Sequence, residues 1–149
     1  MIKEIYFSSE GRINRWRYFK YNVALSILLF LIIFIAALFI LFRYSLSFNT
    51  EEIINSMDTF NRAVNLLALV PMYFLNVKRL HDMNKDNTLA IIFSVAYIIL
   101  NLVDETMPLL PTLAAILASL VSLVLGFYFL LKKGTDGLNQ YGRDPLKKY

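Results

Sequence analysis

Four long apolar stretches alternate with short polar segments along the chain. The first, residues 23–42, is interrupted only by Ser26, and the others cover about residues 60–77, 89–103 and 109–131. A helix rises 1.5 Å per residue, so about twenty residues cross the hydrocarbon core of a bilayer, which is about 30 Å thick. The third stretch reaches only about 22 Å, and its crossing requires polar flanks or local bilayer thinning. The pattern predicts an all-α membrane protein with four transmembrane helices in one integral membrane domain, residues 1–149.

Local signals predict where two of these helices begin. Asn14 is a suitable N-cap for a helix that opens at Arg15. Asn49 followed by Glu52 resembles a capping box, so a helix begun there would project outside the membrane before entering the second span. Pro71 lies within that helix and is a candidate kink. The short connection over residues 104–108 predicts that the last two spans form an antiparallel hairpin.

The distribution of basic residues orients the predicted bundle. Of the 15 Lys and Arg residues, all but Arg43 and Arg62 precede the first span, lie between the second and third, or follow the fourth. Cytoplasmic loops of membrane proteins carry such an excess. We therefore expect a multi-pass protein of the inner (plasma) membrane with both termini in the cytoplasm, including a cytoplasmic tail over residues 132–149.

The composition narrows the chemistry. The chain is 58% hydrophobic and 17% charged, and it has no cysteine and one histidine. Disulfides, thiolate metal sites and cysteine nucleophiles are excluded, and His-based metal cages are disfavoured. We expect no metal and no cofactor. The formal net charge of +4 is explained by membrane topology, so we expect no nucleic-acid partner.

Polar residues inside the spans have two readings. The fourth span carries Thr112, Ala115, Ser119, Ser122 and Gly126 on one helical face, and small residues of this kind allow close helix packing. Asn65 and Asn76 of the second span, and Ser94, Tyr97 and Asn101 of the third, form stripes that we expect to meet inside the bundle. The alternative is that the stripes line a pore or substrate path.

Two polar segments flank the predicted cytoplasmic ends of the first two spans. Residues 11–16 combine a glycine turn with arginines that could simply meet lipid phosphates. Residues 77–84 place Lys78, Arg79, His81 and Asp82 within one and a half turns. If the segment is helical, Lys78 and Asp82 stand at i and i+4 and can pair. His81 and Asp82 are adjacent, about 100° apart around a helix, and are poorly placed as a mutual dyad.

A third polar segment, residues 133–145, follows the last span. Its three glycines permit turns with positive φ and an anion-binding nest of backbone N–H groups. A simple turn that closes the tail over the bundle is an equal alternative. The spacing of a P-loop is absent.

Together these segments resemble the bacterial integral membrane family called domain of unknown function 805. Its pattern has a G-R-hydrophobic-[NS]-R motif, an R-L-H-D motif after the second span and a G-T-x-G-x-N-x-Y-G-x-D-P tail. Here the three motifs correspond to residues 11–15, 79–82 and 134–145. The tail residues that fit the pattern in register are Gly134, Thr135, Gly137, Asn139, Tyr141, Gly142, Asp144 and Pro145. Many members continue after R-L-H-D with a small residue, glycine and tryptophan, whereas this chain has Asn84-Lys85-Asp86-Asn87. The resemblance implies a four-helix inner-membrane fold and supplies no reaction.

The recurrence of the three motifs as a set predicts that they converge in one cluster, where Arg79, His81 and Asp82 contact the 134–144 segment and Arg12. We expect a binding or adaptor module whose cytoplasmic polar side chains hold an anionic lipid headgroup, a small anion or a membrane or cytoplasmic protein partner. The alternative is a small channel or transporter acting as a homo-oligomer. Catalytic motifs are missing, so we expect no enzyme. The candidate binding residues are Arg12, Arg15, Arg79, His81, Asp82, Gly134, Thr135, Asn139, Tyr141 and Asp144.

Overall fold

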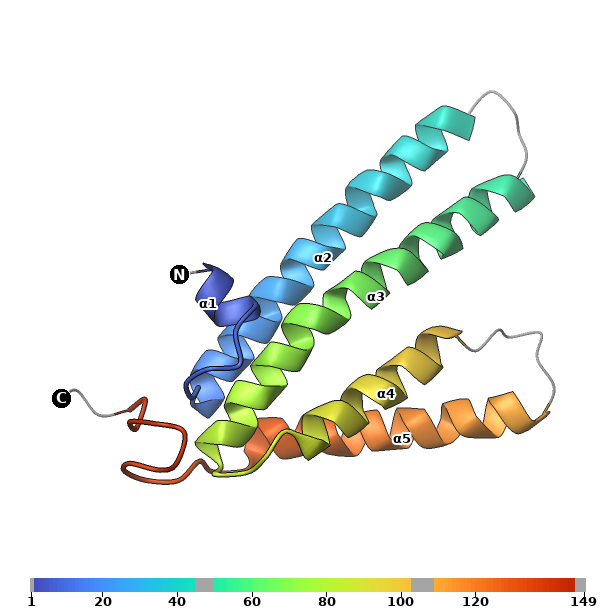
Figure 1. The fold of residues 1–149 in the computed structure, drawn as a ribbon. Coiled ribbons are helices and arrows are strands. Elements are labelled where there is room, and N and C mark those ends of the chain that lie inside the picture. The colour runs from blue at the N-terminus through green and yellow to red at the C-terminus, as the bar shows by residue number, and fades with distance from the viewer. Residues whose placement is uncertain (1, 45–49, 103–108, 147–149) are drawn as a thin grey trace.

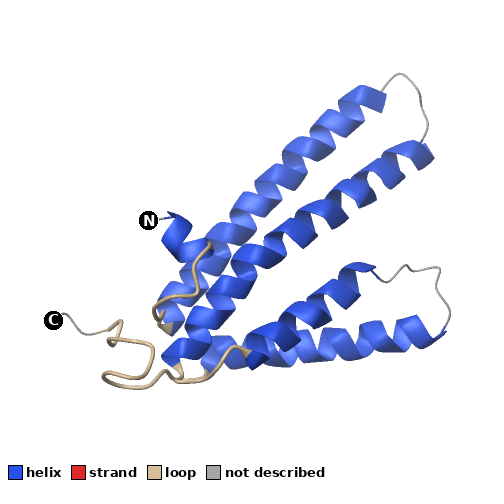
Figure 2. Cartoon of the chain, viewed as in Figure 1, coloured by secondary structure: helices blue, strands red, loops and turns tan. Residues whose placement is uncertain are grey.

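Helices make up most of the chain. The computed structural model describes residues 2–44, 50–102 and 109–146. Figure 2 shows these residues as helices joined by loops, and no strand occurs among them. The helices are α1 (Ile2–Tyr6), α2 (Arg15–Tyr44), α3 (Thr50–Asp82), α4 (Thr88–Leu102) and α5 (Leu109–Leu131). The predicted all-α class is confirmed.

The long helices form two hairpins that are joined at one end. α3 packs against α2 on one side and against α4 on the other, and α4 also packs against α5. In Figure 1 the α2/α3 pair and the α4/α5 pair come together near the two termini and diverge toward their other ends. The start of α2, the end of α3 and the end of α5 therefore lie close together, and this end carries the three polar segments.

Within the described residues, three helices are long and apolar enough to cross a membrane. They are α2, α3 and α5, whereas α4 is an apolar helix of 15 residues. At 1.5 Å per residue, α4 is about 22 Å long, shorter than a hydrocarbon core of about 30 Å. The structure therefore contains helices of membrane-spanning character. The number of four spans, the cytoplasmic position of the termini and the single domain stay predictions.

The predicted N-terminal cap of α2 is confirmed. Asn14 Oδ1 accepts a hydrogen bond from Arg17 N at 2.8 Å, which is the predicted cap of α2. α3 begins at Thr50 and continues through Pro71 to Asp82. Asn49 of the predicted capping box and the 104–108 connection lie outside the described residues.

α3 ends in a Schellman motif at the point where the chain departs from the family pattern. Lys85 N donates to Leu80 O at 2.9 Å, and Asn84 N donates to His81 O at 3.1 Å. Asn84 has a φ of 55°. Asparagine tolerates this left-handed conformation better than other non-glycine residues do, so it can end the helix without a glycine. The turn leads directly into α4.

Apolar burial is concentrated at the joined end of the hairpins. Leu75, Leu80 and Phe129 are completely buried there. Farther along α2, most large apolar side chains are exposed, among them Ile35 and Phe39. Such a surface is suited to lipid rather than water.

The polar stripes of the spans serve helix packing in part. Tyr97 Oη of α4 donates to Asn65 Oδ1 of α3 at 3.4 Å, as the predicted meeting of the two stripes requires. Asn76 does not meet the third span, because its Oδ1 accepts from Tyr18 Oη of α2 at 2.7 Å. In α5, Ser119 is exposed and donates to the Ala115 carbonyl of its own helix.

The short helix α1 was not predicted from the sequence. Tyr6 Oη donates to Tyr21 O of α2 at 3.0 Å, and Lys78 Nζ of α3 donates to the carbonyls of Glu4 and Ile5. Burial, and to a lesser extent neighbouring Tyr21, raises the pKa of the Tyr6 phenol above its usual range. The phenol therefore remains a donor at neutral pH, and α1 is held against both long helices.

Candidate functional site

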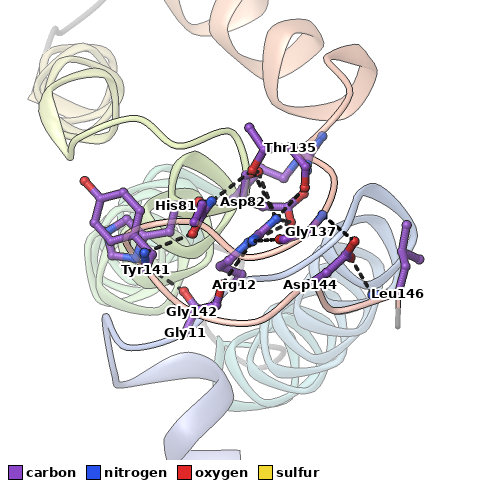
Figure 3. A network of polar contacts seen from close by, with 12 residues as sticks. Gly11, Arg12, His81, Asp82, Thr135, Gly137, Tyr141, Gly142, Asp144 and Leu146 are labelled. Atoms are coloured by element: carbon purple, nitrogen blue, oxygen red, sulfur yellow. Dashed lines mark hydrogen bonds and ion pairs between the residues drawn. The ribbon is translucent and has the colours of Figure 1, made fainter. Parts of the chain in front are cut away.

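The three polar segments meet at the joined end of the hairpins. We call the residues whose side chains connect these segments the polar cluster (Figure 3). They are Arg12, Arg79, His81, Asp82, Thr135, Asn139, Tyr141 and Asp144.

Arg12 lies at the centre of the polar cluster. Gly11, with a φ of 86°, turns the chain before it, and Ile13 N donates to Lys78 O behind it. The buried guanidinium donates to Gly137 O at 2.8 Å, to Thr135 O at 2.7 Å and to Asp82 Oδ1 at 3.2 Å. Figure 3 shows the tail curling around this side chain. Arg12 therefore ties the segment before α2 to the tail and to the end of α3.

Asp82 is shared by two arginines. Its Oδ1 accepts from Arg12, and its Oδ2 accepts from Arg79. The side chains of Arg12 and Arg79 are 1% and 0% exposed, and that of Asp82 is 5% exposed. A carboxylate this deeply buried is tolerable only when paired, and two guanidiniums supply that pairing. Both arginines also donate to backbone carbonyls, which accept charge-assisted hydrogen bonds.

Arg79 closes the C-terminal end of α5. Its Nε donates to Phe129 O at 2.7 Å, and its Nη2 donates to Lys132 O. Arg15 adds a third such contact, from Nη1 to Leu131 O at 3.2 Å. The last carbonyls of a helix have no intrahelical donors, and cations there also complement the helix dipole. The two arginines thus join the α2/α3 hairpin to the end of α5.

His81 stacks on the tail and faces away from Asp82. Its ring lies 3.8 Å from that of Tyr141, with an interplanar angle of 5°. Its Nδ1 is 3.3 Å from Gly11 O, and its Nε2 is 3.0 Å from Asn87 Oδ1. The prediction that His81 and Asp82 form no dyad agrees with these separate partners.

The tail is folded by its own polar side chains. Asp144 Oδ2 accepts from Gly137 N at 3.0 Å, and its Oδ1 accepts from Leu146 N at 2.9 Å. Asn139 Nδ2 donates to His81 O and to Thr135 Oγ1, each at 2.9 Å. Thr135 N donates to Asp82 O at 2.8 Å. These contacts dock the tail on the end of α3.

Gly134 is required at the closest approach of the tail to α3. A Cβ at this position would lie 2.0 Å from Asp82 Oδ2 and 2.6 Å from Asp82 Cγ. No side chain fits there unless the carboxylate leaves its arginine partners. The glycine therefore allows the ion pair and the tail to occupy the same place.

The predicted convergence of the three motifs is confirmed, with one difference in detail. Arg12, His81 and Asp82 contact the 134–144 segment, whereas Arg79 reaches the end of α5 just before it. The pairing of Lys78 with Asp82 that helical spacing allows is not the one that the structure shows. Lys78 turns to the carbonyls of α1 because the two arginines already surround Asp82.

Several partners in the polar cluster could not be recognised from the sequence. They are mainly backbone carbonyls, at Gly11, Phe129, Lys132, Gly137 and Gly142. A carbonyl is present at every residue, so sequence carries no signal for those that accept. Asn87, which faces His81, is one side chain that the motifs did not include. Among the described residues, no three His, Asp or Glu side chains gather closely enough to hold a metal ion.

Long apolar helices and a polar cluster at one end define the class, an all-helical membrane protein. Residues 6–143 match the family described as Protein of unknown function (DUF805), and the chain belongs to this family. The match covers nearly the whole chain and confirms the resemblance seen in the motifs. No curated protein and no solved structure matches the chain significantly.

Proposed function

We propose that this protein is a binding module of the bacterial inner membrane, not an enzyme, and that its polar end holds an anionic phospholipid headgroup. The observation that supports this proposal is a small surface pocket beside the polar cluster, with a volume of about 50 Å³. Arg15 and Lys133 line this pocket together with Asn14, Gly134 and Thr135. Both cationic residues are exposed, unlike Arg12 and Arg79.

The roles of the basic residues divide according to burial. Arg12 and Arg79 direct their donors to Asp82 and to backbone carbonyls inside the protein. We assign them to holding the fold together. Arg15 donates to Leu131 O while its side chain remains at the surface. A guanidinium in this position suits bidentate recognition of phosphate.

The carboxylates that also line the pocket already have partners. Asp82 accepts from two arginines, and Asp144 accepts from two backbone N–H groups. Asp136 Oδ2 lies 2.9 Å from Lys133 Nζ in an exposed pair, which is weak in water and easily exchanged. Repulsion of an incoming phosphate by these groups is therefore reduced.

The aromatic and basic side chains near the pocket are typical of the membrane–water interface, where lipid headgroups lie. Trp16 stacks on Phe19 with ring centroids 5.8 Å apart, and Lys20 Nζ lies 5.0 Å from the Trp16 ring. Amphipathic aromatic rings concentrate at the membrane–water interface. We therefore place the joined end of the hairpins at a membrane interface, and the excess of Lys and Arg at this end favours the cytoplasmic one.

Native mass spectrometry of the detergent-solubilised protein tests this proposal. Phosphatidylglycerol and phosphatidylcholine with identical chains are added, and the retained lipid is compared for wild type and for the Arg15→Gln/Lys133→Gln double variant. Each basic residue near anionic lipid contributes about 1 kcal/mol, so the double variant should lose about thirtyfold in preference for phosphatidylglycerol.

Lys85→Gln is the matched control, because Lys85 is exposed on the α3–α4 connection. It should leave the preference unchanged. Equal retention of both lipids by wild type, or an unchanged double variant, would contradict the proposal. Selective retention of inorganic phosphate would also contradict the proposal and would indicate a small-anion site. Selective retention of a copurifying protein would contradict it as well and would indicate an adaptor role.

A further inference from the structure

An apolar groove lies between α1, α2 and α3, outside the polar cluster. Its volume is about 450 Å³, within the usual range of ligand pockets. The walls include Tyr6 of α1, Leu28 and Ile32 of α2, and Pro71 of α3. Ala24 and Ala68, the smallest of the lining side chains, keep the space between the two long helices open.

The groove runs from the polar end of the molecule into the membrane-spanning region. α1 covers its polar end, where the Tyr6 and Tyr21 rings lie 6.1 Å apart. From Ala24 to Ile32, the first and last residues of α2 that line the groove, the helix axis advances about 12 Å. One leaflet of the hydrocarbon core is about 15 Å deep. The groove can therefore hold most of the length of an acyl chain lying in a single leaflet.

Exposed cationic side chains lie on α1 and on the part of α2 that precedes the groove-lining residues. Arg17 stands one turn before Tyr21, on the face of α2 that continues through Ala24 and Leu28. Its side chain is exposed, and so is that of Lys3 on α1. A phosphate attached to a chain in the groove would therefore meet positive charge at the point where the chain leaves the hydrocarbon.

We propose that this groove holds one acyl chain of an anionic membrane phospholipid, with the phosphate at Arg17. Arg17 and Arg15 are two residues apart, about 200° around the helix, so this site and the Arg15–Lys133 pocket face different sides. The groove site consequently does not depend on the function proposed above. It recognises the chain as well as the headgroup, and α1 covers the site at its polar end.

Photocrosslinking in a bilayer tests the proposal. The full-length protein is reconstituted in phosphatidylethanolamine–phosphatidylglycerol vesicles that contain a trace of phosphatidylglycerol with a diazirine midway along one chain. After irradiation the labelled peptides are mapped. Label on residues 24–32 and 64–71 should exceed label on the exposed residues of α5 about fivefold, and Ala24→Leu should remove that excess by filling the groove.

Three more variants test which features of the groove determine the labelling. Ala114→Leu adds the same volume at an exposed position of α5 and should leave the groove label unchanged. A phosphatidylcholine carrying the same diazirine serves as the neutral probe. Arg17→Gln should reduce the excess of groove label from the phosphatidylglycerol probe to the level seen with this neutral probe. The Arg15→Gln/Lys133→Gln variant should retain the groove label even if the headgroup proposal fails.

Other outcomes would overturn the inference. Label that follows exposure alone, with no effect of Ala24→Leu, would mean that only surrounding lipid touches the groove. If the phosphatidylglycerol and phosphatidylcholine probes label the groove equally, and Arg17→Gln changes neither, the occupant is not selected for its anionic headgroup. Groove residues protected from lipid and crosslinked to a second chain would identify another copy of the protein there instead.

Discussion

Buried charge is the main organising feature at the scale of single residues. The guanidinium of Arg12 reaches Asp82 and two separate parts of the tail, while Arg79 joins the same carboxylate to the end of α5. Removing one partner of such an arrangement leaves a buried charge uncompensated, which costs far more than losing an exposed ion pair. The geometry of the ion pair depends in turn on the absence of a side chain at Gly134.

Gly134→Ala should destabilise the protein by about 2 kcal/mol or more, because the new methyl group displaces Asp82 from its arginines. Thermal unfolding in detergent measures the effect. Gly126→Ala is the matched control, since nothing lies within 4 Å of a Cβ built at this helical glycine. It should leave the melting temperature unchanged or raise it. Equal melting temperatures for both variants would show that the tail does not press on Asp82.

At the scale of elements, α3 connects the other helices. Its N-terminal half contributes Asn65 to a contact with α4, and its C-terminal half contributes Asn76 to α2. Near its C-terminal end, α3 supplies Lys78 to α1 and Arg79 to α5. Helix-to-helix hydrogen bonds in membranes contribute modestly, so their relative weight depends on burial and geometry.

Tyr18→Phe should weaken the α2–α3 contact more than Tyr97→Phe weakens the α3–α4 contact. Asn76 is 2% exposed and its Nδ2 has no hydrogen-bond partner in the structure, so losing Tyr18 Oη would leave the Oδ1 unpaired as well. We expect a loss of about 1–2 kcal/mol for Tyr18→Phe and less than about 0.6 kcal/mol for Tyr97→Phe.

Unfolding of the two purified variants in the same detergent provides the comparison. The matched substitutions each remove one hydroxyl group and leave the ring in place. A larger loss for Tyr97→Phe would mean that the long contact at 3.4 Å outweighs the buried one at 2.7 Å, contrary to the argument from burial.

At the scale of the whole molecule, the hairpins share one polar end and diverge toward the other (Figure 1). The polar cluster joins them where the two termini lie, and that end carries most of the basic residues. The excess of Lys and Arg predicts that this end faces the cytoplasm. The start of α3 then lies on the opposite side of the membrane.

Cysteine accessibility tests this orientation directly, because the natural chain has no cysteine. Ser9→Cys and Asp86→Cys should be protected from a membrane-impermeant maleimide in intact cells and react after permeabilisation. Glu51→Cys should react in intact cells. All three positions are exposed in the protein, so a difference reports membrane sidedness. Labelling of Ser9→Cys in intact cells would reverse the proposed topology.

The sequence by itself determined the class, the long helices and the motifs that meet. Apolar length, the Asn14 cap and the boundaries of the last helix depend on interactions within a few residues, so they can be read along the chain. Tertiary structure decided which partners the polar groups choose. Lys78 is separated from Asp82 by one helical turn, yet it bonds to α1 because two arginines from other segments surround the carboxylate. The choice among several possible partners depends on which groups the fold places within hydrogen-bond distance, and the carbonyl acceptors carry no mark in the sequence.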